Sequence, residues 1–237
     1  MEIAPQTPVD RLERLSWSEA AARFRRDPRL LLPVGSCVQH GPHLPLGTDT
    51  IIVERLAEDV SRRTGLLLAP TVAYGVSARR DREYAGTASL DRKTLHRVLN
   101  EIIESWEGHG LAEVVLLTAN GCARNIQAMS MVMTDTVRVR AIDLTALDLA
   151  RFLEGGAARD HGGELETSLL LHLAPELVRE DAVTDAPLDH PRATERGEPV
   201  PAAGSPGVVG RPSLASAEKG RRIYAHIVTT IVDRLGG

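Results

Sequence analysis

The chain has 237 residues, of which 43% are hydrophobic and 25% charged, and its formal net charge is −4. This length and apolar content allow a substantial core and exclude a mostly disordered protein. The small negative charge argues against nucleic acid or an acidic membrane as the main partner. No apolar run approaches the ~18 residues of a transmembrane helix, and the first residues lack the apolar core of a signal peptide.

The cysteine content indicates the compartment. Cys37 and Cys122 are the two cysteines, and two in a long core-forming chain do not make a disulfide framework. We therefore expect a cytoplasmic protein in which both behave as small buried hydrophobic residues.

Short apolar runs alternate with amphipathic segments along the chain. Four of the runs predict buried strands, at residues 30–34, 66–69, 114–118 and 139–144. Apolar residues at helical spacing predict helices from about 48 to 60, over 95–106, around 129–133, and over 165–173 and 223–235. This alternation is typical of βαβ units and predicts an α/β fold, a single-domain layered sandwich with a mostly parallel sheet and helices on both faces. We expect one domain over residues 1–237, with a Pro- and Gly-rich loop at 182–212.

Polar side chains collect where predicted strands end or predicted helices begin, which is where ligands bind in open α/β sheets. Several of them are N, O and S donors of the kind that Zn²⁺ accepts, namely His40, His43, Asp49, Cys122, His161 and Glu166. The residues alone also fit structural roles. Asp49 is a suitable helix cap, Glu166 a suitable partner of a helix dipole, and His43 and His161 suitable hydrogen-bonded structural histidines.

Residues 32–50, Leu-Pro-Val-Gly-Ser-Cys-Val-Gln-His-Gly-Pro-His-Leu-Pro-Leu-Gly-Thr-Asp-Thr, resemble the signature of the creatininase (creatinine amidohydrolase) family. The likeness continues through 74–77, 120–125 and 161–168 and ends in 207–220, which is most similar to the mycofactocin-associated peptidase branch. The resemblance implies a layered creatininase-like α/β fold and homo-oligomers, often hexamers. It also implies a two-metal site that hydrolyses C–N bonds of cyclic amides, formamides or short peptides.

The chain departs from the family pattern at several metal-site positions. Val38 stands where the family has a ligand Glu, Cys122 stands where it has a ligand His, and a further histidine is replaced within 78–81. By the resemblance, one metal position retains only Asp49 and a Cys122 thiolate. The other keeps its ligands, which are His40, Asp49 and Glu166. The resemblance therefore implies a degenerate site with at most one divalent metal, Zn or Fe/Mn.

Three functions are compatible with this altered site. The first is a creatininase-like enzyme acting on an amide or related C–N bond of a small molecule or peptide, with His161 or His43 moving protons. The second is a repurposed, metal-independent biosynthetic enzyme in which Cys122 is the nucleophile of a condensation, cyclisation or acyl transfer. The third is a non-catalytic binding or oligomer subunit. In each case we expect a homo-oligomer with no nucleic-acid or membrane partner.

Overall fold

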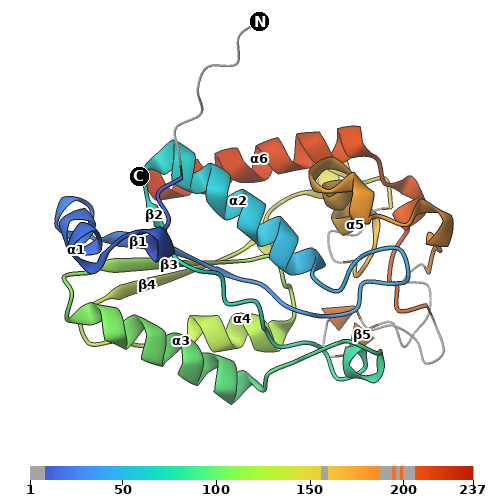
Figure 1. Cartoon of the computed structure of the whole chain (residues 1–237). Helices are drawn as coiled ribbons and strands as arrows, with labels where there is room; N and C mark the ends of the chain where they lie inside the picture. The colour runs from blue at the N-terminus through green and yellow to red at the C-terminus, as the bar shows by residue number, and fades with distance from the viewer. Residues whose placement is uncertain (1–8, 156–159, 187–193, 196–197, 200–205, 237) are drawn as a thin grey trace, which may run out of the picture.

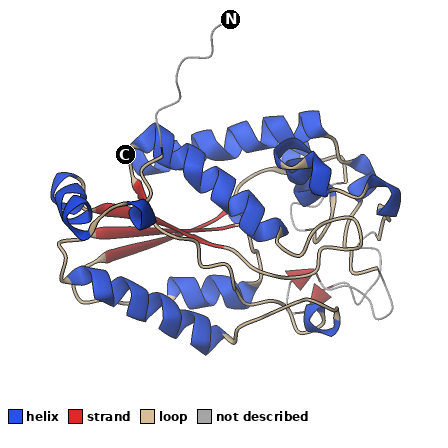
Figure 2. Cartoon of the chain, in the orientation of Figure 1, coloured by secondary structure: helices blue, strands red, loops and turns tan. Residues whose placement is uncertain are grey.

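The computed structural model describes residues 9–155, 160–186, 194–195, 198–199 and 206–236. A four-stranded parallel sheet, in the order β2-β1-β3-β4, runs through the middle of the molecule (Figure 2). Its strands are β1 (Arg29–Val34), β2 (Leu67–Leu68), β3 (Glu113–Thr118) and β4 (Arg138–Asp143). All four predicted strands are therefore confirmed, with ends that shift by at most one residue.

Helices cover both faces of the sheet, as the sequence predicts (Figure 1). One face carries α2 (Thr48–Thr64), α5 (Glu164–Leu173) and α6 (Ala217–Gly236). The other face carries α3 (Arg92–Glu107) and α4 (Ala123–Ser130). This arrangement confirms the expected α/β class with a parallel sheet.

Burial on both faces explains why the central strands have continuous apolar runs. Leu31 packs into the core beneath α2, α5 and α6, whereas its neighbours Leu30 and Leu32 pack into the core beneath α3. Successive side chains of a strand point to opposite faces, so a strand covered on both sides requires apolar residues throughout. β4 departs from the prediction of a buried strand, because it is an edge strand and leaves Ala141 exposed.

Two helices differ from the sequence prediction. The predicted helix around 129–133 is α4, which begins earlier and ends at Ser130, so Met133 lies beyond it and is 77% exposed. Helix α1 (Trp17–Arg26) was not predicted, although Ser16 and Glu19 form a capping box at its start.

Seven 3-10 helices and a second sheet complete the described part of the chain. The 3-10 helices are Leu12–Arg14, Asp81–Glu83, Leu144–Ala146, Ala150–Phe152, Pro175–Leu177, Glu180–Ala182 and Pro212–Leu214. Within the predicted loop at 182–212, β5 (Thr194–Glu195) and β6 (Glu198–Pro199) form an antiparallel pair, and residues 187–193, 196–197 and 200–205 lie outside the described residues.

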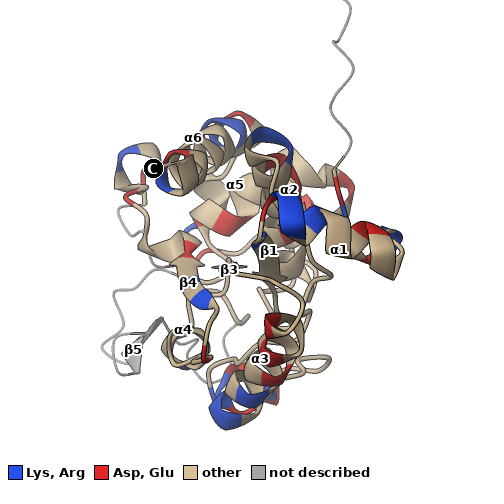
Figure 3. Cartoon of the chain, turned by 90° about the vertical axis from the view of Figure 1, so that its left-hand side faces the viewer, with Lys and Arg blue, Asp and Glu red and all other residues tan. Residues whose placement is uncertain are grey.

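The described surface mixes both signs of charge. Figure 3 shows acidic and basic residues interspersed on α1, α2, α3 and α6. Among the described residues, no helix is long and apolar enough to span a membrane.

Candidate active site

Two stretches that are distant in sequence, residues 40–49 and 161–166, build a polar cluster around the ring of His40. His40 lies between β1 and α2, Asp49 lies in the first turn of α2, and Glu166 lies in the first turn of α5. His161 precedes α5 and is held by an antiparallel bridge to Val209. The cluster therefore depends on the fold to bring the starts of α2 and α5 together, and those two helices pack directly on each other.

The ring of His40 has a defined orientation. Its Nδ1 lies 3.0 Å from the carbonyl oxygen of Val38, to which it donates a hydrogen bond. Its Nε2 then faces two carboxylates, 3.3 Å from Asp49 Oδ1 and 3.6 Å from Glu166 Oε1. The His40 side chain is only 1% exposed, so these groups interact away from bulk water.

Each carboxylate is held by its other oxygen. Asp49 Oδ2 accepts a hydrogen bond from the Ser36 hydroxyl, and Glu166 Oε2 accepts one from the Gly162 N–H at 2.6 Å. The two remaining oxygens are the ones that face His40. Asp49 is not a helix cap, because Gly47 occupies that position and α2 has no side-chain cap.

The electrostatics of the cluster favour a positive charge at its centre. Burial lowers the pKa of His40, but the charges of Glu166 and Asp49 outweigh burial and raise that pKa well above its usual value. Burial raises the pKa of Asp49, but the His40 charge outweighs it and the net shift is downward. Nearby Asp160 is different: burial and the Glu166 charge raise its pKa to about 8, so it is mostly a neutral acid at pH 7.

Two pairs of donors in the cluster have the spacing of ligands on one divalent cation. Two ligands that are each about 2.0–2.2 Å from one tetrahedral Zn²⁺ lie roughly 3.3–3.6 Å apart. The separations of His40 Nε2 from Asp49 and Glu166 match that spacing and exceed the ~2.7–2.9 Å of a charge-assisted hydrogen bond. His40, His161 and Glu166 also have ligand atoms within 4.8 Å of one another. Asp49 is not part of that group, although its Oδ1 lies 3.3 Å from His40 Nε2.

His161 lies beside this centre and has partners of its own. Its ring centroid is 4.6 Å from that of His40, and its side chain is 14% exposed. Its Nε2 lies 2.9 Å from Gln39 Nε2 and 3.5 Å from Asp81 Oδ1. Gln39 and Asp81 were missed by the sequence analysis. The available signals were the place of Gln39 next to a candidate ligand and an isolated acid among the arginines of residues 79–82.

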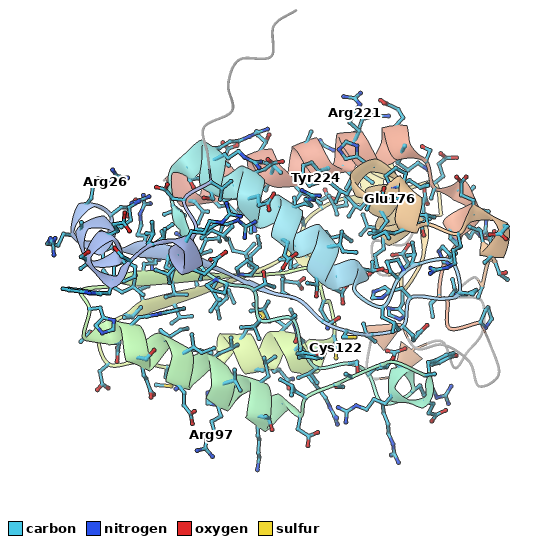
Figure 4. The ribbon with its side chains drawn as sticks, viewed as in Figure 1. Arg26, Arg97, Cys122, Glu176, Arg221 and Tyr224 are labelled. Atoms are coloured by element: carbon cyan, nitrogen blue, oxygen red, sulfur yellow. The ribbon has the colours of Figure 1, made fainter. Side chains whose placement is uncertain are left out.

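Two predicted catalytic residues lie outside the group with metal-ligand spacing. His43 is fully buried, and its Nε2 lies 2.9 Å from the Thr167 hydroxyl. Burial also lowers the pKa of His43. Cys122 precedes α4, where its N–H donates to Asn120 Oδ1 at 2.9 Å and its side chain packs partly against the core beneath α3 (Figure 4).

The positions at which the chain departs from the family offer few ligands. Val38 is 3% exposed and is part of the apolar interior. Cys122 and Cys37 are not joined in a disulfide, and both are half-buried rather than fully buried as expected. In the part of the chain that the structure describes, His40, His161 and Glu166 are the one group of three or more such side chains with metal-ligand spacing.

The fold and this cluster define an α/β enzyme with a buried histidine–carboxylate centre. Residues 13–235 match the sequence profile of the creatininase family, described as creatinine amidohydrolase. The chain belongs to the creatininase family.

Named relatives agree with that assignment. The chain is 36% identical to the mycofactocin precursor peptide peptidase of Mycobacterium ulcerans (strain Agy99), over 88% of this chain and 84% of the relative. It is 30% identical to the creatinine amidohydrolase of Pseudomonas putida, over 93% and 94% of the two chains. A solved structure described as "Creatininase Mn" superposes with a TM-score of 0.81 at 27% identity, covering 97% of this chain and 98% of the other. The chain is thus an amidohydrolase-like enzyme that acts on C–N bonds.

Proposed function

We propose that this enzyme hydrolyses an amide bond of a short peptide or small molecule with one divalent metal per chain, held by His40, Asp49 and Glu166. The observation that carries the proposal is the arrangement around His40 Nε2, where two carboxylate oxygens lie 3.3 and 3.6 Å away. Zn²⁺ accepts one imidazole and two carboxylates with a position left open, and Mn²⁺ or Fe²⁺ accepts the same donor types. The higher identity to a peptide peptidase supports a peptide over a cyclic amide as substrate.

The residues around the ligands have distinct roles in this proposal. Ser36 and Gly162 orient the two carboxylates, and the Val38 carbonyl orients the ring of His40. A cation bound there supplies Lewis-acid polarisation of the amide carbonyl and of water.

His161 is the better candidate for proton transfer to the leaving amine. Its side chain is 14% exposed and lies next to the centre, whereas His43 is fully buried against Thr167. A group that exchanges a proton with substrate must reach it, which favours His161 over His43.

The alternative of a metal-independent reaction at Cys122 makes a different prediction, because it needs no cation. The proposed homo-oligomer and a place in a biosynthetic pathway rest on family membership alone.

Metal analysis of substituted chains tests the proposal. Protein purified without chelator is compared with His40→Ala and with His109→Ala, which removes an exposed histidine just after α3. We expect the wild type and His109→Ala to hold metal and to lose peptide or amide hydrolysis on chelation, and His40→Ala to hold none. A wild type that is active without metal, but inactive as Cys122→Ala, would establish the thiol reaction instead.

A further inference from the structure

The side chain of Gln39 joins four segments around the active site. It is 5% exposed and follows β1, two residues before Gly41. Its Nε2 lies 2.7 Å from Asp81 Oδ1, 2.9 Å from the Gly207 carbonyl oxygen and 2.9 Å from His161 Nε2. Its Oε1 accepts the Gly41 N–H at 2.9 Å.

These contacts determine which end of the Gln39 side-chain amide is the oxygen and which is the NH₂ group. A Gln side chain has one acceptor oxygen and one donor NH₂ group, and the amide nitrogen does not accept hydrogen bonds. If the amide were turned over, its NH₂ would face the Gly41 N–H, and its oxygen would face the oxygens of Asp81 and Gly207. All three contacts would become repulsive, so the NH₂ group must be the end that faces His161.

The same reasoning determines where His161 carries its proton. The nitrogen facing it can only donate, so His161 Nε2 at 2.9 Å must accept. A proton on Nε2 would point at the hydrogens of the amide, and the Asp81 oxygen at 3.5 Å is too distant for a good hydrogen bond. With two hydrogens and three acceptors, one N–H of Gln39 is shared between two of them, a common three-centre arrangement.

We propose that Gln39 is a positioning residue that fixes the tautomer of His161, with Nε2 unprotonated and the proton on Nδ1. In this form neither ring nitrogen is free to bind a cation, because Nε2 accepts from Gln39 and Nδ1 carries the proton. His161 is thereby kept out of the ligand set, and its Nδ1–H is available as a hydrogen-bond donor. The ligands of the proposed function, His40, Asp49 and Glu166, do not include His161.

The packing around Gln39 supports this role. Gly207 has φ +83°, and a Cβ there would lie 2.1 Å from Gln39 Oε1. The absence of a side chain at Gly207 therefore allows the amide to lie against its backbone. A Gly207→Ala substitution would displace the amide without changing its chemistry, which provides a second perturbation besides the removal of Gln39.

The tautomer of His161 can be read directly from two-bond ¹H–¹⁵N correlation spectra of the full chain with ¹⁵N-labelled histidine. His161→Asn identifies its signals. We expect the Nδ1–H form in the wild type and in Gln127→Met, a matched substitution of an exposed Gln on α4. Gln39→Met and Gly207→Ala should give a mixture with the Nε2–H form. The Nε2–H form in the wild type would overturn the inference. This measurement does not depend on the folding of any variant.

The exclusion of His161 from the metal ligands rests on the proposed function, whereas the tautomer of His161 does not. Measuring the metal content of variants tests the two separately. We expect His161→Asn to keep the metal that His40→Ala loses. Equal loss in both variants would show that His161 is a ligand and would overturn the inference. A wild type that binds no metal but shows the Nδ1–H tautomer would refute the proposed metal and leave the role of Gln39 intact.

Discussion

The hydroxyl of Ser36 offers a sensitive test of the metal centre, because it touches a proposed ligand without being one. It donates to Asp49 Oδ2 and leaves Oδ1 facing His40. Ser36→Ala removes this hydrogen bond, and the only atom lost from this buried position is the hydroxyl oxygen. We expect the variant to fold and to bind metal more weakly.

The size of the effect follows from the geometry. Loss of a hydrogen-bond partner that orients a metal ligand typically lowers metal affinity by about 10–100-fold, or about 1.4–2.7 kcal/mol. Asp49 has its remaining oxygen directed at His40, and the loss of Ser36 frees the carboxylate to rotate away. We therefore expect the upper half of that range.

Competition with a chromogenic zinc chelator measures the affinity. The matched control is Ser61→Ala, in the same helix as Asp49, because Ser61 is also buried and donates to the Leu66 carbonyl at 2.7 Å, unconnected to the cluster. Both variants should lose similar stability, but only Ser36→Ala should lose affinity. Unchanged affinity in Ser36→Ala, or an equal loss in Ser61→Ala, would refute the reasoning.

Two further predictions concern the metal count and the buried ion pair. Val38→Glu combined with Cys122→His should raise the bound metal, measured by elemental analysis, to about two per chain, and no increase would mean that these positions do not belong to a second site. Lys219→Met should lower the free energy of unfolding, measured with denaturant, by about 3 kcal/mol, because it leaves the buried carboxylate of Glu164 without its cation. Arg221→Met, which removes the cation of an exposed pair with Glu218, should lower it by less than about 1 kcal/mol. Burial raises the pKa of Glu164, but backbone and Lys219 hydrogen bonds outweigh it, so its folded pKa is lowered. The contribution of ionised Glu164 to the free energy of unfolding should be complete above its unfolded pKa of about 4.5 and disappear as the pH falls through the lower folded value. The stability of Lys219→Met should depend less on pH in this acid range.

Local sequence patterns predict most of the fold. β1 and β3 were located within one residue, because strands buried on both faces need uninterrupted apolar runs. The end of α4 was misplaced because Val132 is buried in the segment after the helix, where its spacing from Met129 imitates a further turn.

The proposed ligands could be selected from the sequence, but the residues that surround them could not. His40, Asp49 and Glu166 are of ligand type and stand in a recognisable motif, and the structure brings them together. Gln39 and Asp81 are common residue types, and their roles arise from contacts between loops that are 42 residues apart. Such contacts leave no periodic pattern in the sequence. The predicted roles of His43 and Cys122 remain predictions.

The number of metal ions that one chain holds at saturation tests the central claim most directly. Elemental analysis of the wild-type protein, after loading with excess Zn²⁺ or Mn²⁺ and removal of the unbound ion, gives this number without a known substrate. We predict one ion per chain, held by His40, Asp49 and Glu166. Two ions per chain would contradict the claim that Val38 and Cys122 have removed the second position, and none would contradict the single-metal site itself.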